Sequence, residues 1–237
     1  MDRRARGRDS AGSLSGWRLS SRSLSSSALH RRTTCVDCFR SSHCPCVCTF
    51  TESFTAWILL FLVQSCLVSA RRTDLHRRLG VFAGLLVVPM LVSGVTVALA
   101  WARQESSVAV GALARESRLV VMVIPLASVL LFASLAGIGL YMRRRSDVHK
   151  RLMLLATIAL LPPALGRIPI LAANGPAAFF GVTLLFVLSI VLYDYRTWRR
   201  VHPASLWGGL CLAASFPGRI ALANTDAWQT FARWLTS

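Results

Sequence analysis

Three histidines are the residues of this sequence best suited to bind a cofactor. His76, His149 and His202 each stand at the start of an apolar segment. Neutral imidazole is a common ligand of haem iron and of other metals, and helical bundles build such sites from facing side chains. The pattern is typical either of a haem or metal site or of interfacial histidines with a structural role. No histidine lies deeper in an apolar segment, so these residues could hold one haem at most.

Small residues follow the first of these histidines at helical spacing. Gly80 and Gly84 come four and eight positions after His76, which leaves a smooth stripe on the predicted helix. A flat macrocycle could lie against that stripe. The backbone of a neighbouring helix could also lie there, which is the usual role of a Gly-x-x-x-Gly pattern in membranes.

Three aspartates lie near the same helix ends. Asp74 and Asp147 each precede a histidine by two positions and are suited to cap its helix. Asp194 closes the fifth apolar segment, where its expected partners are Arg196, Arg199 or one of the histidines. Aspartates and histidines at one face can relay protons, but capping or salt bridging is the commoner use.

Two arginines within apolar segments form a second candidate site. Arg167 and Arg219 lie eighteen and seventeen residues after the histidines of their segments. At a rise of ~1.5 Å per residue, both guanidinium groups are roughly 26 Å further along their helices. Charged residues inside membranes tend to face the bundle interior, where two arginines would bind a carboxylate, a phosphate or a lipid head group. Alternatively, each long side chain snorkels to the outer interface.

Six apolar segments must position these side chains. Each approaches or exceeds the roughly 17–25 residues that a helix needs to cross a bilayer. We therefore predict an all-α integral membrane protein with six transmembrane helices. The first is short and carries Gln64 in its middle, and Trp57 at its start is expected to anchor at the interface. The segments are 54–70, 80–101, 118–142, 152–173, 178–195 and 205–224.

The composition supports a membrane protein. Of the 237 residues, 54% are hydrophobic and only 16% are charged, with a net charge of +17. Ordinary soluble domains carry about a quarter charged residues. The arginines cluster between apolar segments and not on an amphipathic surface, so we expect the lipid bilayer as a partner and no nucleic acid.

Basic residues are distributed unequally between the two ends of the segments. The turns after the first, third and fifth segments carry twelve, and the opposite side carries four. By the positive-inside rule the richer side faces the cytoplasm, which predicts a multi-pass protein of the bacterial cytoplasmic (inner) membrane with both termini outside. The three basic turns also resemble one another, at 71–79, 144–152 and 199–204. This similarity predicts three helical hairpins arranged as parallel repeats.

Two helix starts also carry a family resemblance. They read His-Arg-Arg-Leu-Gly at 76–80 and His-Lys-Arg-Leu-Met at 149–153. In these motifs the chain resembles uncharacterised bacterial families of predicted membrane proteins with a His-Arg-Arg-Leu-Gly and a His-Arg-x-x-Met signature. The resemblance covers about residues 70–170. It implies a multi-pass membrane protein without an assigned activity.

Residues 1–50 differ from the transmembrane domain predicted for 51–237. They contain nine arginines and eleven serines but no apolar run long enough to bury, so we expect disorder. An organellar transit peptide or an over-called start codon would explain this composition, and we expect the second. Five cysteines between positions 35 and 48 lack the spacing of a zinc site, and we do not expect zinc there.

The sequence contains no motif of conventional catalysis, such as a nucleotide-binding glycine loop or a zinc-binding His-Glu-x-x-His helix. We therefore do not expect an enzyme. The predicted function is binding of an anion or lipid head group near the outer face through Arg167 and Arg219. The alternative is a b-type haem or metal-binding redox protein that uses His76, His149 and His202 at the cytoplasmic face.

Overall fold

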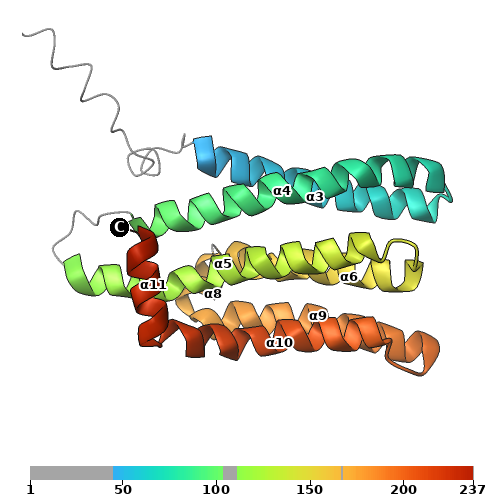
Figure 1. Ribbon diagram of the computed structural model, residues 1–237. Coiled ribbons are helices and arrows are strands. Elements are labelled where there is room, and N and C mark those ends of the chain that lie inside the picture. The colour runs from blue at the N-terminus through green and yellow to red at the C-terminus, as the bar shows by residue number, and fades with distance from the viewer. Residues whose placement is uncertain (1–44, 104–110, 167, 237) are drawn as a thin grey trace, which may run out of the picture. The chain divides into compact units, whose positions relative to one another are not determined.

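The computed structural model describes residues 45–103, 111–166 and 168–236, all of them within one unit of the chain, Cys35–Ser237. Every regular element in these ranges is a helix (Figure 1). The elements are α3 (Pro45–Ser69), α4 (Thr73–Arg103), α5 (Gly111–Tyr141), α6 (Ser146–Ala159), α7 (Leu161–Leu165), α8 (Pro169–Ala173), α9 (Pro176–Trp198), α10 (Pro203–Ala223) and α11 (Asp226–Thr236).

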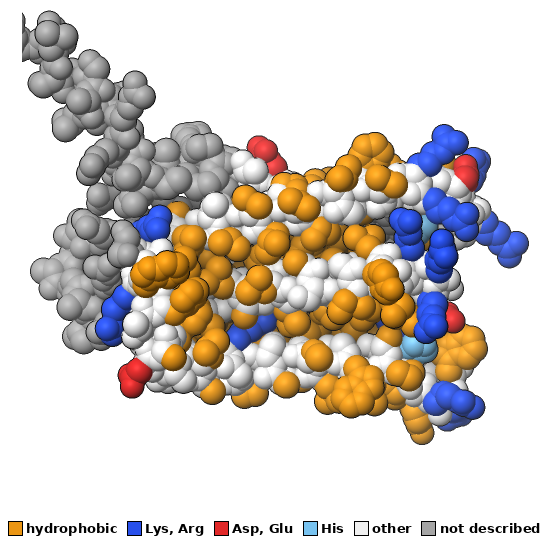
Figure 2. All heavy atoms as spheres, viewed as in Figure 1, with side chains coloured by type: hydrophobic (Ala, Val, Ile, Leu, Met, Phe, Trp, Pro, Cys, Tyr) orange, Lys and Arg blue, Asp and Glu red, His pale blue; other side chains and the backbone are white. Residues whose placement is uncertain are grey.

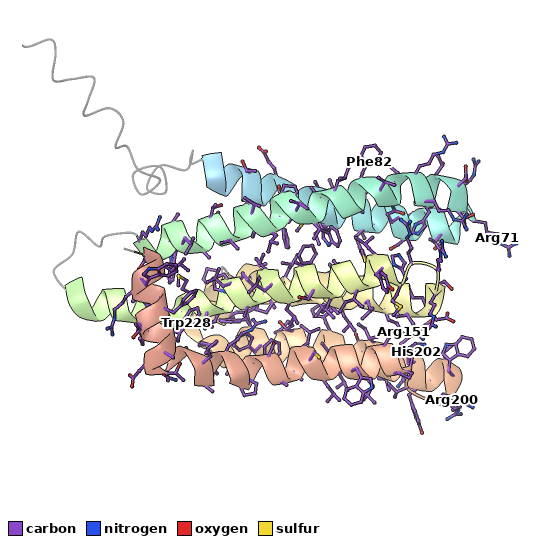
Figure 3. The ribbon with its side chains drawn as sticks, in the orientation of Figure 1. Arg71, Phe82, Arg151, Arg200, His202 and Trp228 are labelled. Carbon is purple, nitrogen blue, oxygen red and sulfur yellow. The ribbon has the colours of Figure 1, made fainter. Side chains whose placement is uncertain are left out.

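The predicted fold class is confirmed. Among the described residues, six helical stretches are long and apolar enough to cross a membrane. The face of α4 that turns away from the bundle is apolar, with Phe82 63% exposed and Leu85 64% exposed, as expected for contact with lipid (Figure 3). The stretches are Thr49–Ser69, Thr73–Arg103, Leu119–Tyr141, Ser146–Leu165, Pro176–Trp198 and Pro203–Ala223.

Two boundaries differ from the prediction. Helix α3 begins at Pro45, so residues 45–50 belong to it although the sequence analysis assigned them to the tail. The fourth predicted segment, 152–173, is not one helix. It breaks after Ala159 because Pro162 and Pro163 lack the backbone N–H groups that would continue the helical ladder. The short helices α7 and α8 follow the break.

Three basic turns lie at one end of the bundle. They join α3 to α4, α5 to α6 and α9 to α10, and the arginine and lysine side chains gather around them (Figure 2). Arg71 and Arg199 close two of these turns in the left-handed conformation, with φ of 57° and 53°. We call this end the basic end. The charge pattern predicted this grouping, whereas the side of the membrane and the repeat relation stay predictions.

The main hydrophobic core packs α3, α4, α5 and α6 together and includes buried residues of α9 and α10. Trp57, Phe132 and Met90 are its largest fully buried members, and the Trp57 and Phe132 rings meet edge to face with their centroids 4.8 Å apart. At the opposite end, α11 lies across the bundle (Figure 1). Its Trp228 donates a hydrogen bond of 2.9 Å from Nε1 to the Leu119 carbonyl oxygen, which fastens α11 to α5.

Candidate functional site

A cavity of about 360 Å³ lies near the basic end, between α3, α4 and the α5–α6 hairpin. Its walls are mostly apolar and include Trp57 and Phe61. His76 and His149 line it as well, so the structure brings two of the three predicted histidines together. We call this space the histidine cavity. Its other lining residues are Leu60, Gln64, Ser65, Val68, Gly80, Ala83, Leu140, Ser146, Lys150 and Met153.

The two histidines come from different hairpins. The ring centroids of His76 in α4 and His149 in α6 lie 6.3 Å apart, with 78° between the ring planes. Nδ1 of His149 is 2.7 Å from the carbonyl oxygen of Gly139. A carbonyl oxygen only accepts hydrogen bonds, so this Nδ1 carries the hydrogen. In the neutral ring Nε2 of His149 then holds the free lone pair, which is the form that binds metals.

Gln64 of α3 is a candidate site residue that the sequence analysis missed. Its amide Oε1 and Nε2 atoms, together with Nδ1 of His76, are buried and have no hydrogen-bond partner in the described part of the chain. An unsatisfied buried polar group costs about 1–3 kcal/mol, and native structures usually supply a water or another group for it. The available signal was an amide in the middle of an apolar segment.

The glycine stripe after His76 has two different surroundings. A Cβ atom added to Gly80 would meet only Nε2 of Gln64, at 4.0 Å, so this position opens into the histidine cavity. A Cβ added to Gly84 would lie 3.5 Å from Cδ1 of Leu140, in ordinary contact with α5. The stripe therefore faces the histidine cavity at Gly80 and a side chain of α5 at Gly84, and neither glycine lies against the backbone of a neighbouring helix.

Trp57 is not an interface anchor, and that prediction is wrong. The side chain is 1% exposed and donates from Nε1 to Oγ1 of Thr157 at 3.1 Å. The position near a segment end suggested an interface, but α3 extends further toward the N-terminus than expected and places Trp57 within the bundle. Trp57 therefore forms part of the cavity wall.

His202 has a separate role. It is the N-cap of α10, where its Nδ1 accepts a hydrogen bond of 3.1 Å from the backbone N–H of Ala204. It does not line the histidine cavity. The three histidines thus share the basic end without forming one cluster, and His202 follows the structural interpretation.

A buried ion pair joins Arg151 of α6, labelled in Figure 3, to Asp194 of α9. Nε of Arg151 donates to both carboxylate oxygens, at 3.1 and 3.0 Å, and a second nitrogen donates at 2.5 Å. Ser205 of α10 donates to the same carboxylate at 2.5 Å. Arg151 is 6% exposed and Asp194 is 1% exposed. These contacts, the Arg151 network, join α6, α9 and α10.

Asp194 does not pair with Arg196 or Arg199, the two arginines expected as its partners, but the backbone of His202, one of the expected histidines, does donate to its carboxylate. Arg196 and Arg199 are exposed at the end of α9. Asp194 faces inward instead, where it meets Arg151 on the inner side of α6. In the sequence, Arg151 is recognisable only as one of the twelve basic residues of the basic turns.

The two remaining aspartates lie at helix starts and are exposed. Asp147 is in the first turn of α6 and pairs with Lys150 at 3.6 Å. It does not cap the helix as predicted, because the N-cap position belongs to Arg145, which makes no side-chain capping bond. Asp74 is in the first turn of α4, where its charge complements the helix dipole.

Arg219 lies in α10 and is buried inside the bundle. It is 3% exposed, and one terminal nitrogen donates to Oγ of Ser128 at 2.9 Å. Its guanidinium carbon lies 5.8 and 5.5 Å from the ring centroids of Phe180 and Phe216. The Nε and Nη2 atoms have no partner among the described residues. The side chain therefore points into the bundle and does not snorkel.

Several predicted features lie outside the described residues. Arg167 is one, so the structure does not test its pairing with Arg219. The tail up to residue 44, with three of its cysteines, is another. Within the described ranges, no group of three or more His, Cys, Asp or Glu side chains is placed to hold a metal ion.

The comparisons with known proteins give no relative. The chain matches no family model, no curated protein and no solved structure.

Proposed function

We propose that this membrane protein binds an apolar ligand in the histidine cavity. The supporting observation is the set of buried, unpartnered polar atoms of Gln64 and His76 on the wall of an otherwise apolar space. A cavity of about 360 Å³ falls within the usual size range of ligand sites. The ligand would place its apolar body against Trp57 and Phe61 and a polar or metal centre near the imidazoles.

The proposed location is the bacterial inner membrane, with the basic end facing the cytoplasm. The support is the excess of arginine in the turns that the structure groups together. The ligand would then sit in the cytoplasmic half of the membrane. It would reach the cavity from the lipid phase or be inserted during folding.

Filling the cavity tests this function. Gly80→Leu adds a side chain that projects into the cavity, whereas Gly137→Leu adds the same group where nothing lies within 4 Å and the surface is exposed. Native mass spectrometry of protein purified in mild detergent should detect a bound molecule in the wild type and in Gly137→Leu but not in Gly80→Leu. A wild type without any bound mass, or equal occupancy in all three proteins, would contradict the proposal.

A second function is supported by Arg219, namely binding of an anion or a lipid head group near the outer face. A charged side chain inside a membrane is costly and usually serves a ligand, a pathway or a partner charge. Arg219 has no carboxylate partner among the described residues, and two of its nitrogens are free to donate. The aromatic faces of Phe180 and Phe216 shield it from lipid.

Lipid analysis tests this second function. Arg219→Gln should lose an anionic lipid or carboxylate that co-purifies with the wild type, and Arg219→Lys should retain part of it. Arg196→Gln removes an equal charge from an exposed position and serves as the control. If Arg219→Gln retains the same lipids as Arg196→Gln, Arg219 has no anionic ligand.

A further inference from the structure

We infer that the ligand of the histidine cavity is haem, with His76 and His149 as its two axial ligands. This inference rests on the proposed function, because it names the ligand of the same cavity. Four features of the described residues carry it: the separation of the rings, the hydrogen bonding of His149, the small number of ligating groups and the distribution of polarity around the cavity.

The separation of the two rings matches a metal bound between them. In such a complex each coordinating nitrogen is about 2.0 Å from the metal and about 1.1 Å from its ring centroid, which separates the centroids by roughly 6.2–6.4 Å. The observed separation of His76 and His149 is 6.3 Å. The angle of 78° between the planes is compatible with this arrangement, because each ring can rotate about its own bond to the metal.

The hydrogen bond of His149 prepares it as a ligand. Histidine ligands commonly donate their second ring N–H to a carbonyl or carboxylate, which fixes the tautomer and the ring orientation. Nδ1 of His149 makes such a bond with the Gly139 carbonyl oxygen at 2.7 Å. Nδ1 of His76 is buried without a partner, and the Gln64 side chain in the same cavity carries an unpartnered acceptor.

The number of ligating side chains favours haem over a bare metal ion. A structural zinc site needs four protein ligands and a catalytic site needs three. The described ranges offer no such group, and the cavity supplies two imidazoles. Haem brings four equatorial nitrogens of its own, so two histidines complete its coordination. Both axial positions would be filled, leaving no position on the iron for a substrate.

The distribution of apolar and charged residues around the cavity also matches that of haem, which has an apolar macrocycle and two charged propionates. The aromatic rings of Trp57 and Phe61 and the open surface at Gly80 suit a flat apolar macrocycle. Lys150 lines the same cavity but has a side chain that is 58% exposed, so it lies at the edge. A haem inserted with its propionates toward the basic end would place their negative charges near this lysine.

Haem loading of paired variants tests the inference. The protein is produced with added haem precursor, or loaded with haemin after purification, and its absorption and electron paramagnetic resonance spectra are recorded. Wild type and His202→Ala should each hold one haem per chain with the low-spin signal of two axial imidazoles. His76→Ala and His149→Ala should lose the haem or convert it to a five-coordinate, high-spin form.

Ligand replacement covers the case in which an alanine variant does not fold. His76→Met and His149→Met keep the side-chain volume and a ligating atom, so they should retain haem with an altered spectrum and a raised reduction potential. The inference would be overturned if the wild-type protein took up no haem by either route. It would also be overturned if substitutions at His76 and at His149 left the haem spectra unchanged. If native mass spectrometry then shows another molecule that Gly80→Leu removes, the cavity function stands without haem. If it shows none, both fail.

Discussion

Arg151 and Arg219, the two arginines buried in the described part of the chain, have opposite surroundings. Arg151 meets the carboxylate of Asp194 through several hydrogen bonds, and Ser205 satisfies the same carboxylate from a third helix. Arg219 is equally buried but has one hydroxyl partner, Ser128, and two free nitrogens. A buried charge with its counter-ion needs no ligand, whereas a buried charge without one indicates that the site is incomplete.

The histidines show the same contrast at the basic end. His202 caps α10 through its own ring nitrogen. His76 and His149 instead face a cavity that also contains the unpartnered amide of Gln64. Residue type and helix position are alike in these cases, so the hydrogen-bond partners distinguish an architectural role from a site.

Breaking the Arg151 network should have the largest effect on stability. Asp194→Ala leaves the Arg151 charge buried without a partner and should lower the free energy of unfolding by about 3–5 kcal/mol. Thermal unfolding in detergent would measure the change. Asp147→Ala removes a carboxylate that is 70% exposed and should cost about 1 kcal/mol or less.

A double variant sharpens this prediction. Arg151→Met with Asp194→Leu removes both charges and should recover most of the stability that either single change loses, because no ion stays buried alone. If the double variant is as unstable as Asp194→Ala, packing around these residues explains the loss and the contrast with Arg219 weakens.

Glycine substitutions compare the filled core with the cavity and should have an intermediate effect. A Cβ added to Gly208 would lie 2.6 Å from Cδ1 of Leu155, so Gly208→Ala forces buried side chains to move and should cost about 1–3 kcal/mol. Gly80→Ala has open space and should leave ligand-free protein within about 0.5 kcal/mol of wild type. Equal melting temperatures for the two variants would contradict the cavity at Gly80.

Replacing Arg219 should have the smallest effect on the ligand-free protein. Arg219→Met removes a poorly satisfied buried charge with a side chain of similar length, so its stability should lie within about 1 kcal/mol of wild type or above it. Arg151→Met should be strongly destabilised, because it leaves the Asp194 carboxylate buried without its ion-pair partner. The same unfolding assay tests both. A loss in Arg219→Met as large as that in Arg151→Met would contradict the proposed difference between the sites.

Much of the fold could be predicted because bilayer crossing depends on local properties. The six segments follow from apolar length, the grouping of the turns follows from charge, and the double proline at 162–163 explains the break after α6. Helix boundaries were less predictable, since a polar start such as Pro45–Ser53 can still join a helix that packs against α4.

The sites could be predicted only in part, because side-chain direction depends on packing between distant helices. The sequence identified His76 and His149, but it could not separate them from His202, whose role depends on the local geometry of its own cap. It could not pair Asp194 with Arg151, which lies 43 positions away in sequence. In the sequence, Gln64 is visible only as a polar residue in the middle of the first apolar segment, and nothing there indicates that it faces a cavity.

The stability of the protein in the presence of haemin tests the central claim most directly. A ligand that binds only the folded protein stabilises it by about 2.7 kcal/mol at a hundred times its dissociation constant. Wild type and His202→Ala should therefore melt at progressively higher temperatures as haemin is added, and His149→Ala should not. An equal rise for His149→Ala, or no rise for wild type, would contradict haem binding between His76 and His149.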